Sequence, residues 1–181
     1  MPVLIICTYF ALLLIPFAIG LIIGMEKSLQ FKDVLKLNSI TTVVLGAFSF
    51  AGLGLAYLFN NSDIKFMGAI LILVAGFTTL NKGGKSNAFL FSVDVLNIKY
   101  YFFSNVAVGL SVMLATFGLK LFCPVTWQYP LLFIAFSFII CFLGIWFGKK
   151  IKTIKIIKIS LLLSGIMLFL IGLIMFFLIW K

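Results

Sequence analysis

The four residues Ala47-Phe48-Ser49-Phe50 return unchanged as Ala135-Phe136-Ser137-Phe138, 88 positions later. A second string, Phe-Ala-Ile-Gly-Leu at residues 17–21, is echoed by Val-Ala-Val-Gly-Leu at residues 106–110, 89 positions later. A third, looser pair lies 97 positions apart, and the additional residues fall in the lysine-rich stretch after Phe147. Because the three pairs occur in the same order, the sequence predicts two copies of one structural unit.

The composition is that of a membrane protein. Hydrophobic residues make up 64% of the 181 positions and charged residues only 10%, and the mean hydropathy is +1.30. A soluble domain averages about 45–50% apolar residues, so this chain has too little polar surface to cover a globule in water. The net charge of +10 comes from 14 lysines. Lysines that flank apolar runs are explained by topology and anionic lipid, and we therefore expect no binding to nucleic acid.

Six apolar runs are long enough to cross about 30 Å of hydrocarbon at about 1.5 Å per residue. The runs are continuous, whereas the strands of a membrane barrel alternate, so helices are the expected form. We predict an all-α integral membrane protein with a first three-helix repeat at 1–80, a cytoplasmic linker at 81–99 and a second repeat at 100–181. The expected spans are 3–25, 39–59, 64–80, 100–120, 129–148 and 159–180.

The lysines predict the orientation of these spans. Eleven of them lie in the connections after spans one, three and five, and three lie on the other side. Cytoplasmic connections carry the excess of positive charge. We therefore expect the chain to span the cell membrane of a bacterial cell, with both termini outside the cytoplasm. The larger group is Lys27, Lys32, Lys36, Lys82, Lys85, Lys99, Lys149, Lys150, Lys152, Lys155 and Lys158.

Three spans per repeat is an odd number, so the second copy enters the bilayer from the opposite side. The two halves are then inverted repeats related by an axis in the membrane plane. Transporters built in this way hold a shared site near the midplane and open it to either side in turn.

Two features are expected at the membrane surfaces. Tyr100, Tyr101 and Trp146 fit an inner aromatic belt, and a second belt is expected at the outer surface. The lysine-rich stretch 149–158 fits contact with anionic lipid, although it also serves as the topology signal for the last span. The lysines concerned are Lys149, Lys150, Lys152, Lys155 and Lys158.

The chain has little chemistry for catalysis or for metal binding. It contains no histidine, and its four carboxylates, Glu26, Asp33, Asp63 and Asp94, lie in connections or at span ends. Acid–base pairs, nucleophile–base pairs and phosphate-binding glycine loops are all missing from the sequence. We therefore expect no enzyme, no cofactor and no metal site.

Comparison of the two repeats indicates a polar site within the spans. Pro16 in span one corresponds to Asn105 in span four, and Ile15 to Ser104. A proline leaves the carbonyl four residues earlier, that of Leu12, without its helical hydrogen bond. With the symmetry-related hydroxyls of spans two and five, these groups form a candidate substrate site. Alternatively, the same groups bond helix to helix. The candidate residues are Asn105, Ser104, Pro16, Leu12, Ser49 and Ser137.

The glycines are more typical of packing. Residues 20–24 and 144–148 each place two glycines four positions apart, a spacing that lets membrane helices approach closely.

The layout resembles that of the MntP/YtaF-type manganese efflux proteins of the wider LysE-like transporter group. The local likenesses are residues 65–76 (Lys-Phe-Met-Gly-Ala-Ile-Leu-Ile-Leu-Val-Ala-Gly), 147–150 (Phe-Gly-Lys-Lys), 163–172 (Leu-Ser-Gly-Ile-Met-Leu-Phe-Leu-Ile-Gly) and 17–20 (Phe-Ala-Ile-Gly). The resemblance implies the fold of two three-span halves. That family carries an aspartate shortly before a run like Phe-Ala-Ile-Gly in each half. In this chain the corresponding positions hold Ile15 and Ser104.

Three functions fit these features. The leading one is a small transporter that exports a small cation or another solute by alternating access. The alternatives are a non-transporting accessory protein of the sporulation type descended from such a transporter, and a six-helix substrate-binding component of a multi-subunit importer. A homo-oligomer is compatible with all three.

Overall fold

The computed structural model describes residues 2–26, 28–59, 65–84, 97–150 and 154–179, and these form long helices. Each of the six is long and apolar enough to cross a membrane, as the sequence predicts. The helices are α1 (Pro2–Met25), α2 (Phe31–Tyr57), α3 (Lys65–Gly84), α5 (Ile98–Phe122), α6 (Gln128–Lys150) and α7 (Ile154–Ile179).

Three helices extend four or more residues beyond the predicted spans. α2 begins eight residues before position 39, α7 begins five residues before position 159, and α3 runs four residues past position 80. At the start of α2, the Gln30 backbone N–H donates to Asp33 Oδ2 over 3.3 Å, and Gln30 O accepts from the Asp33 N–H over 3.0 Å. These bonds satisfy backbone groups that a helix end leaves without partners. Charged residues therefore continue the helix beyond the apolar run.

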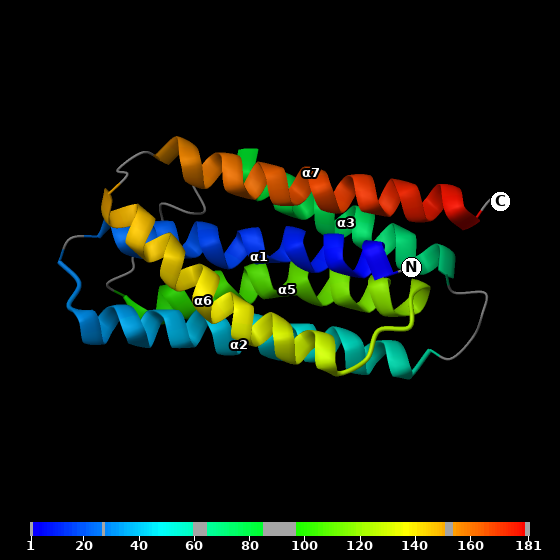
Figure 1. Ribbon diagram of the computed structural model, residues 1–181, viewed down its shortest axis with the longest axis horizontal. Coiled ribbons are helices and arrows are strands. Elements are labelled where there is room, and N and C mark those ends of the chain that lie inside the picture. Colours follow the sequence, from blue (N-terminus) through cyan, green and yellow to red (C-terminus); the bar gives the residue numbers. More distant parts are fainter. Residues whose placement is uncertain (1, 27, 60–64, 85–96, 151–153, 180–181) are drawn as a thin grey trace.

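The helices form an elongated bundle in which the two sequence halves interleave (Figure 1). The most extensive packing pairs α3 with α7, α1 with α6 and α2 with α5. Next come α3 with α5 and α1 with α7, while α2 and α6 touch over a shorter length. Each helix of residues 1–80 thus packs chiefly on helices of residues 100–181, so the bundle depends on both halves.

The start of α1 and the end of α7 lie at one end of the bundle, and the end of α1 and the starts of α2, α5 and α7 lie at the other (Figure 1). α3 is shorter than its neighbours, and its last turn stops short of that second end (Figure 1).

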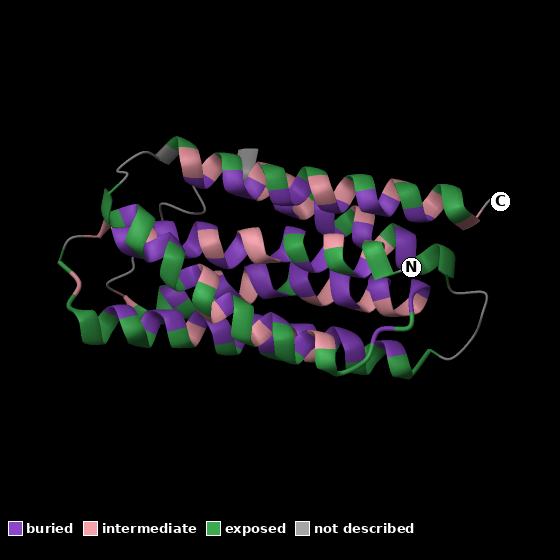
Figure 2. Ribbon diagram, in the orientation of Figure 1, coloured by how far each residue is buried: buried purple, intermediate pink, exposed green. Residues whose placement is uncertain are grey.

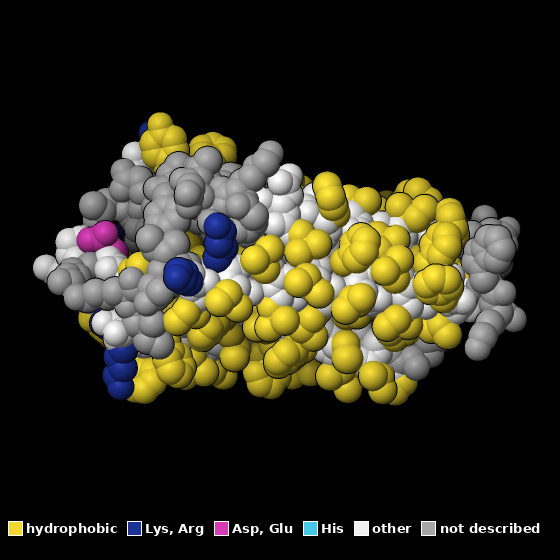
Figure 3. Space-filling model, turned by 90° about the horizontal axis from the view of Figure 1, so that it is seen from above, with side chains coloured by type: hydrophobic (Ala, Val, Ile, Leu, Met, Phe, Trp, Pro, Cys, Tyr) yellow, Lys and Arg dark blue, Asp and Glu magenta, His cyan; other side chains and the backbone are white. Residues whose placement is uncertain are grey.

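The surface is apolar along most of the bundle. Buried residues line the inward faces of the helices, and exposed residues lie outside (Figure 2). Many of those exposed residues are large hydrophobic ones, for example Phe10, Phe103 and Phe177. On the face drawn in Figure 3, hydrophobic side chains cover the length of the bundle, and lysine and acidic side chains gather at one end. Exposing such an apolar surface to water is unfavourable, so the surface fits a membrane protein.

Glycines bring α1 and α6 into close contact, as their spacing predicts. A Cβ atom added at Gly20 would lie 2.1 Å from the carbonyl oxygen of Cys141, and one at Gly24 would lie 2.2 Å from that of Ile145. From the other side, a Cβ at Gly144 would lie 2.4 Å from the carbonyl oxygen of Phe17. Real Cβ atoms do not come so near to backbone oxygens, so only glycine fits at this crossing.

The prediction of an inner aromatic belt is wrong for one residue, Tyr101. Tyr100 and Trp146 are 63% and 49% exposed, as interfacial residues would be, but Tyr101 is only 1% exposed. Its ring faces the bundle interior because a helix turns by about 100° per residue, which puts neighbours such as Tyr100 and Tyr101 on different faces.

Candidate functional site

A polar stripe runs along one face of α2. Asn38, Thr41, Thr42 and Ser49 are all buried, with exposed fractions between 0% and 5%. Their spacing of three, four and seven residues places them on one side of the helix. From Asn38 to Ser49 the stripe covers about 16 Å, at about 1.5 Å per residue. This is about half of the thickness of a bilayer's hydrocarbon core.

Tyr101 connects this stripe to α5. Its hydroxyl is hydrogen-bonded to Thr41 Oγ1 and lies 3.3 Å from the carbonyl oxygen of Leu37, to which it donates. One turn further along α5, Asn105 Nδ2 donates to the Tyr101 carbonyl oxygen over 2.9 Å. On the α6 side, Asn38 Nδ2 donates to the carbonyl oxygen of Phe138 over 3.2 Å. Polar contacts therefore join α2 to α5 and to α6, the two helices that pack most extensively against it.

Several polar atoms in the same region have no hydrogen-bond partner. Each belongs to a buried side chain on α1, α2, α5 or α6, and none makes a hydrogen bond of good geometry within the described structure. Two of them, the Tyr9 and Ser49 hydroxyls, interact with each other. We call this set the polar track. Its atoms are Tyr9 Oη, Asn38 Oδ1, Thr42 Oγ1, Ser49 Oγ, Asn105 Oδ1 and Ser137 Oγ.

An unpartnered buried polar group costs about 1–3 kcal/mol. Native structures contain few such groups, and each calls for an explanation such as bound water, an ion or a functional role. Six such atoms between four neighbouring helices indicate a region that can interact with something polar.

Three of the six predicted site residues belong to the polar track. Asn105 on α5, Ser49 on α2 and Ser137 on α6 each carry one of its unpartnered atoms. Ser104 is half-buried on α5 and is not part of the track. Of the helices that carry these three residues, α5 and α6 both pack on α2.

Pro16 and Leu12 lie elsewhere, in the packed part of α1. α1 continues through Pro16 without a break, and Leu12 is fully buried. The nearby carbonyls are used by α7: Ser164 Oγ donates to Ala11 O over 2.7 Å, and Ser160 Oγ donates to Leu14 O over 3.0 Å. These bonds join helix to helix, in line with the alternative interpretation of the buried polar groups.

A second polar feature involves Lys82, which the sequence places in a cytoplasmic connection. In the structure Lys82 lies in the last turn of α3 and is half-buried. Its Nζ donates to the carbonyl oxygen of Ala107 over 2.7 Å and to Ser111 Oγ over 3.0 Å. Ser111 Oγ also lies 3.2 Å from Thr78 Oγ1. The helix continues past position 80 because its last turns pack against α7, where a Cβ at Gly165 would lie 2.7 Å from the Leu80 backbone nitrogen.

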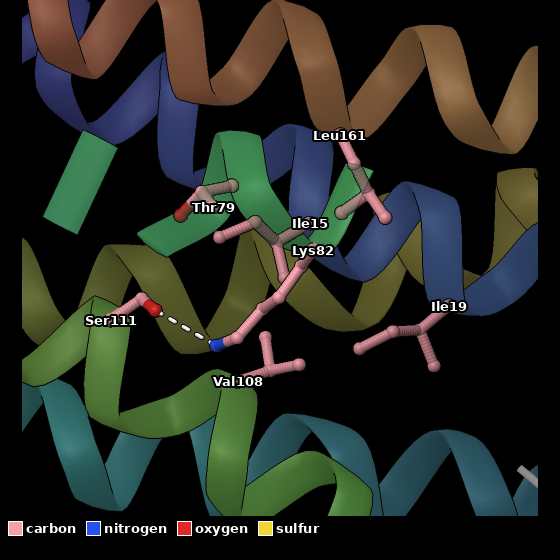
Figure 4. A pocket seen from close by; sticks show the side chains of 7 residues that line it. All are labelled: Ile15, Ile19, Thr79, Lys82, Val108, Ser111 and Leu161. Carbon is pink, nitrogen blue, oxygen red and sulfur yellow. Dashed lines mark hydrogen bonds between the residues drawn. The ribbon is translucent and has the colours of Figure 1, made fainter. Parts of the chain in front are cut away.

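The Lys82 side chain borders a small hollow between α1, α3, α5 and α7 (Figure 4). The space that a water-sized molecule can enter amounts to about 10 Å³, which is room for about one water. Apart from Lys82, the lining is mostly aliphatic, with two hydroxyl groups: Ile15, Ile19, Thr79, Val108, Ser111 and Leu161.

The acidic residues and cysteines that the structure describes are dispersed. Within the ranges given above, no three His, Cys, Asp or Glu side chains gather closely enough to hold an ion. Glu26 and Asp33 both lie at the connection between α1 and α2, where Glu26 accepts from Ser28 and Asp33 caps α2. Asp63 and Asp94 lie outside the described residues.

Of the predicted lipid-binding lysines, Lys149 and Lys150 form the last turn of α6, and Lys155 and Lys158 lie in the first turns of α7. Lys152 lies outside the described residues. Lys150 Nζ lies 3.8 Å from the centre of the Trp146 ring, a cation–π contact at the end of α6.

Comparisons with protein-family models, with curated proteins and with solved structures found no match to this chain.

One of the two polar features, the stripe on α2, could have been sought in the sequence. Thr42 and Ser49 lie seven residues apart, and Asn38 lies four residues before Thr42, a spacing that predicts one helix face. Asn38 lay just outside the expected span. Lys82 carried no such signal, because a lysine followed by two glycines is typical of a connection.

Proposed function

We propose that this protein is a small membrane transporter that moves a small solute through the bundle between two inverted halves. The observation that carries the proposal is the polar track, in which six buried polar atoms on α1, α2, α5 and α6 make no hydrogen bond of good geometry among the described residues. A purely structural bundle gains nothing from such atoms, whereas a solute passing between the helices would satisfy them in turn.

The helix packing supports an inverted repeat. Exchanging α1 with α5, α2 with α6 and α3 with α7 converts the α1–α6 pair into α5–α2, and both are extensive contacts. The same exchange converts α3–α5 into α7–α1, which form the next most extensive contacts. The α2–α6 and α3–α7 pairs map onto themselves, as contacts across a two-fold axis would.

The lysines support an orientation in a bacterial cell membrane with both termini outside the cytoplasm. Lys32, Lys36 and Lys99 lie at the end of the bundle where α2 and α5 begin, together with the four described lysines of α6 and α7. Lys65 and Lys120 lie at the other end. The first end carries the larger positive charge and would face the cytoplasm and its anionic lipid.

The resemblance to manganese efflux proteins supports a transporter of this shape more than it supports manganese as the substrate. Ile15 and Ser104 occupy the places of that family's aspartates, and Ile15 lines the hollow beside Lys82. A fixed positive charge next to the central helices would oppose the passage of a divalent cation.

Flux through proteoliposomes tests the proposal. Vesicles containing the protein would be loaded with manganese chloride, glycerol or sodium isobutyrate, which carry a divalent cation, a neutral solute and an organic anion. We expect wild-type protein to move glycerol or isobutyrate faster than empty vesicles do, and Asn105→Leu to abolish that flux. Ser39→Ala, an exposed hydroxyl on α2 that bonds its own helix at Leu35 O, is the matched control.

If none of the three solutes moves faster than in empty vesicles, the accessory role becomes the better account. If manganese alone moves, cation export survives without the two aspartates.

A further inference from the structure

The unpartnered atoms of the polar track are all oxygens. Apart from the Tyr9 and Ser49 hydroxyls, which interact with each other, four remain, and we call them the oxygen set. Their side chains are at most 5% exposed. The atoms are Asn38 Oδ1, Thr42 Oγ1, Asn105 Oδ1 and Ser137 Oγ. Buried groups of this kind lower the stability of a fold, so a ligand that contacts them would stabilise it.

Both asparagine amides of the oxygen set are held with the oxygen free. Asn38 Nδ2 donates to the Phe138 carbonyl oxygen over 3.2 Å, and Asn105 Nδ2 donates to the Tyr101 carbonyl oxygen over 2.9 Å. A carbonyl oxygen can bond only the nitrogen end of an amide, so each bond determines which end is left over. The two amides therefore offer acceptors, and the two hydroxyls of the set can accept as well.

Asn105 lies close to the level of Thr42 along the bundle. α2 and α5 begin at the same end (Figure 1) and pack extensively on each other. The Tyr101 hydroxyl is bonded to the residue before Thr42, and a Cβ atom added at Gly109 would lie 2.3 Å from the Phe48 side chain. Halfway between these two contacts, Asn105 is level with a point two or three residues past Thr42.

Ser137 reaches nearly the same level from α6. α6 runs opposite to α2, because α2 begins at the end of the bundle where α6 ends (Figure 1). The residue after Ser137 accepts the bond from Asn38, and the Ile134 side chain lies 2.4 Å from a Cβ atom added at Gly46. Between these contacts, Ser137 is level with a point about two residues before Thr42. At about 1.5 Å per residue, the three residues of the set on α2, α5 and α6 therefore lie within about 7 Å along the axis.

This level is near the middle of the helices. Thr42 is the twelfth of the 27 residues of α2, and Ser137 is the tenth of the 23 residues of α6. Asn38 lies one turn before Thr42 on the same face of α2. In a bundle that spans a bilayer, the oxygen set would lie close to the midplane, where transporters with inverted repeats hold substrates and coupling ions.

The chemistry of the oxygen set defines the ligand. Hard cations bind oxygen atoms, and carbonyl oxygens without a negative charge can replace the water around a monovalent cation. Calcium and magnesium ions are usually held through carboxylates, whereas Glu26 and Asp33, the carboxylates within the described residues, are engaged at the start of α2. An anion is disfavoured by two oxygens that can only accept.

Size favours an ion over an organic solute. The four side chains are almost fully enclosed, and the hollow beside Lys82 has none of them in its lining. A sodium ion is about as large as a calcium ion, whose ligand oxygens lie at about 2.3–2.6 Å. Such an ion fits between side-chain oxygens without the cavity that an organic molecule needs.

The charge of Lys82 favours a monovalent over a divalent cation. Its ammonium is bonded to Ala107 and Ser111, two and six residues after Asn105. At about 100° per residue, these positions lie on the other side of α5 from Asn105. Repulsion between charges is proportional to each charge, so a divalent cation at the oxygen set would be repelled twice as strongly as sodium.

We propose that Asn38, Thr42, Asn105 and Ser137 bind a dehydrated sodium ion through their side-chain oxygens in the middle of the bundle. This inference rests on the proposed function in so far as the ion crosses the membrane with the transported solute. It differs from the sequence-based expectation of no metal site, which considered carboxylate, imidazole and thiolate ligands.

Equilibrium binding of radiolabelled sodium to the purified chain in phosphatidylcholine nanodiscs tests the site, with choline chloride keeping the ionic strength constant. We expect saturable binding to the wild type and binding weakened by about tenfold or more in Thr42→Val, which corresponds to about 1.4 kcal/mol. Thr116→Val is the matched control. Thr116 is also buried, but its hydroxyl donates to the Val112 carbonyl oxygen over 2.9 Å, so this variant should bind sodium as the wild type does.

Thermal unfolding in the same nanodiscs separates a lost ligand from a damaged fold. A ligand that binds the folded state raises its stability, so the wild type should unfold at a higher temperature in sodium chloride than in choline chloride. Thr42→Val should be at least as stable as the wild type in choline chloride, because it removes an unpartnered hydroxyl, and sodium should not stabilise it further. Ser137→Ala, which removes a second oxygen of the set, covers the case in which Thr42→Val does not fold.

Three results would overturn the site. The first is no saturable sodium binding to the wild type, which would leave ordered water as the partner of these oxygens. The second is wild-type affinity in folded Thr42→Val and Ser137→Ala. The third is equal displacement of sodium by equimolar potassium, which would mean that the set selects charge alone and not a small ion.

Flux measurements in proteoliposomes separate the site from the transport function. Sodium binding that depends on Thr42, without flux of sodium, glycerol or isobutyrate, would support the site and remove the transport proposal. Flux of glycerol or isobutyrate in a protein that binds no sodium would support transport and remove the site.

Discussion

Asn105 has one satisfied and one unsatisfied polar group in the same amide. Its Nδ2 donates to the Tyr101 carbonyl oxygen over 2.9 Å, while its Oδ1 is buried without a partner. A hydrogen bond inside a membrane protein contributes about 0.6 kcal/mol on average. The unpaired oxygen costs more, about 1–3 kcal/mol. At this position the sequence therefore keeps a group that lowers the stability of the fold.

Replacing Asn105 by leucine, which has the same branched shape, tests this reasoning. We expect the free energy of unfolding to stay the same or to rise by about 1–2 kcal/mol, because the unpaired oxygen is removed together with one weak bond. Unfolding of the purified protein in mixed micelles by increasing fractions of SDS measures the change. A clear loss of stability would mean that Asn105 is a structural residue and that its oxygen is satisfied by groups such as ordered water.

The helix elements could be predicted from the sequence because each needs a long apolar run to cross a bilayer. The α1–α6 contact could also be predicted in part, since glycine pairs four residues apart are typical of close crossings. The ends of α2, α3 and α7 could not, because charged residues outside the hydrocarbon continue a helix without any change in the apolar pattern.

The α1–α6 crossing provides a prediction at the scale of the elements. Gly144→Ala would place a Cβ atom 2.4 Å from the Phe17 carbonyl oxygen and 3.1 Å from the Leu21 backbone nitrogen, so the two helices must move apart. We expect a loss of about 1–3 kcal/mol in the free energy of unfolding, measured by the same SDS titration.

Gly54→Ala is the matched control for this crossing, because nothing lies within 4 Å of a Cβ atom added there. We expect no loss of stability in this variant. Equal destabilisation by both substitutions would contradict the close packing of α1 on α6.

At the scale of the whole molecule, the comparison of the two predicted repeats selected Asn105, Ser49 and Ser137. The fold places Ser49 on α2 and the other two residues on α5 and α6, which both pack on α2. Lys82 could not be found in this way, because its contacts depend on where α3 ends relative to α5. Tyr101 and Thr41 were missed for a similar reason, since their contact joins residues 60 positions apart. Such information lies in the tertiary packing and not in a local pattern.

The central claim is that a site inside the bundle opens to both sides of a membrane. We would test it by labelling Ser137→Cys with a membrane-impermeant thiosulfonate, applied to either side of oriented vesicles. The native cysteines, Cys7, Cys123 and Cys141, would first be replaced by alanine. Lys149→Cys and Lys120→Cys, at opposite ends of the bundle, serve as controls that should each react from one side only, the cytoplasmic and the outer side respectively.

The account predicts that Ser137→Cys reacts from both sides, because the polar track is exposed to each side in turn. Reaction from one side only, or from neither side while both controls react, would contradict alternating access through this bundle.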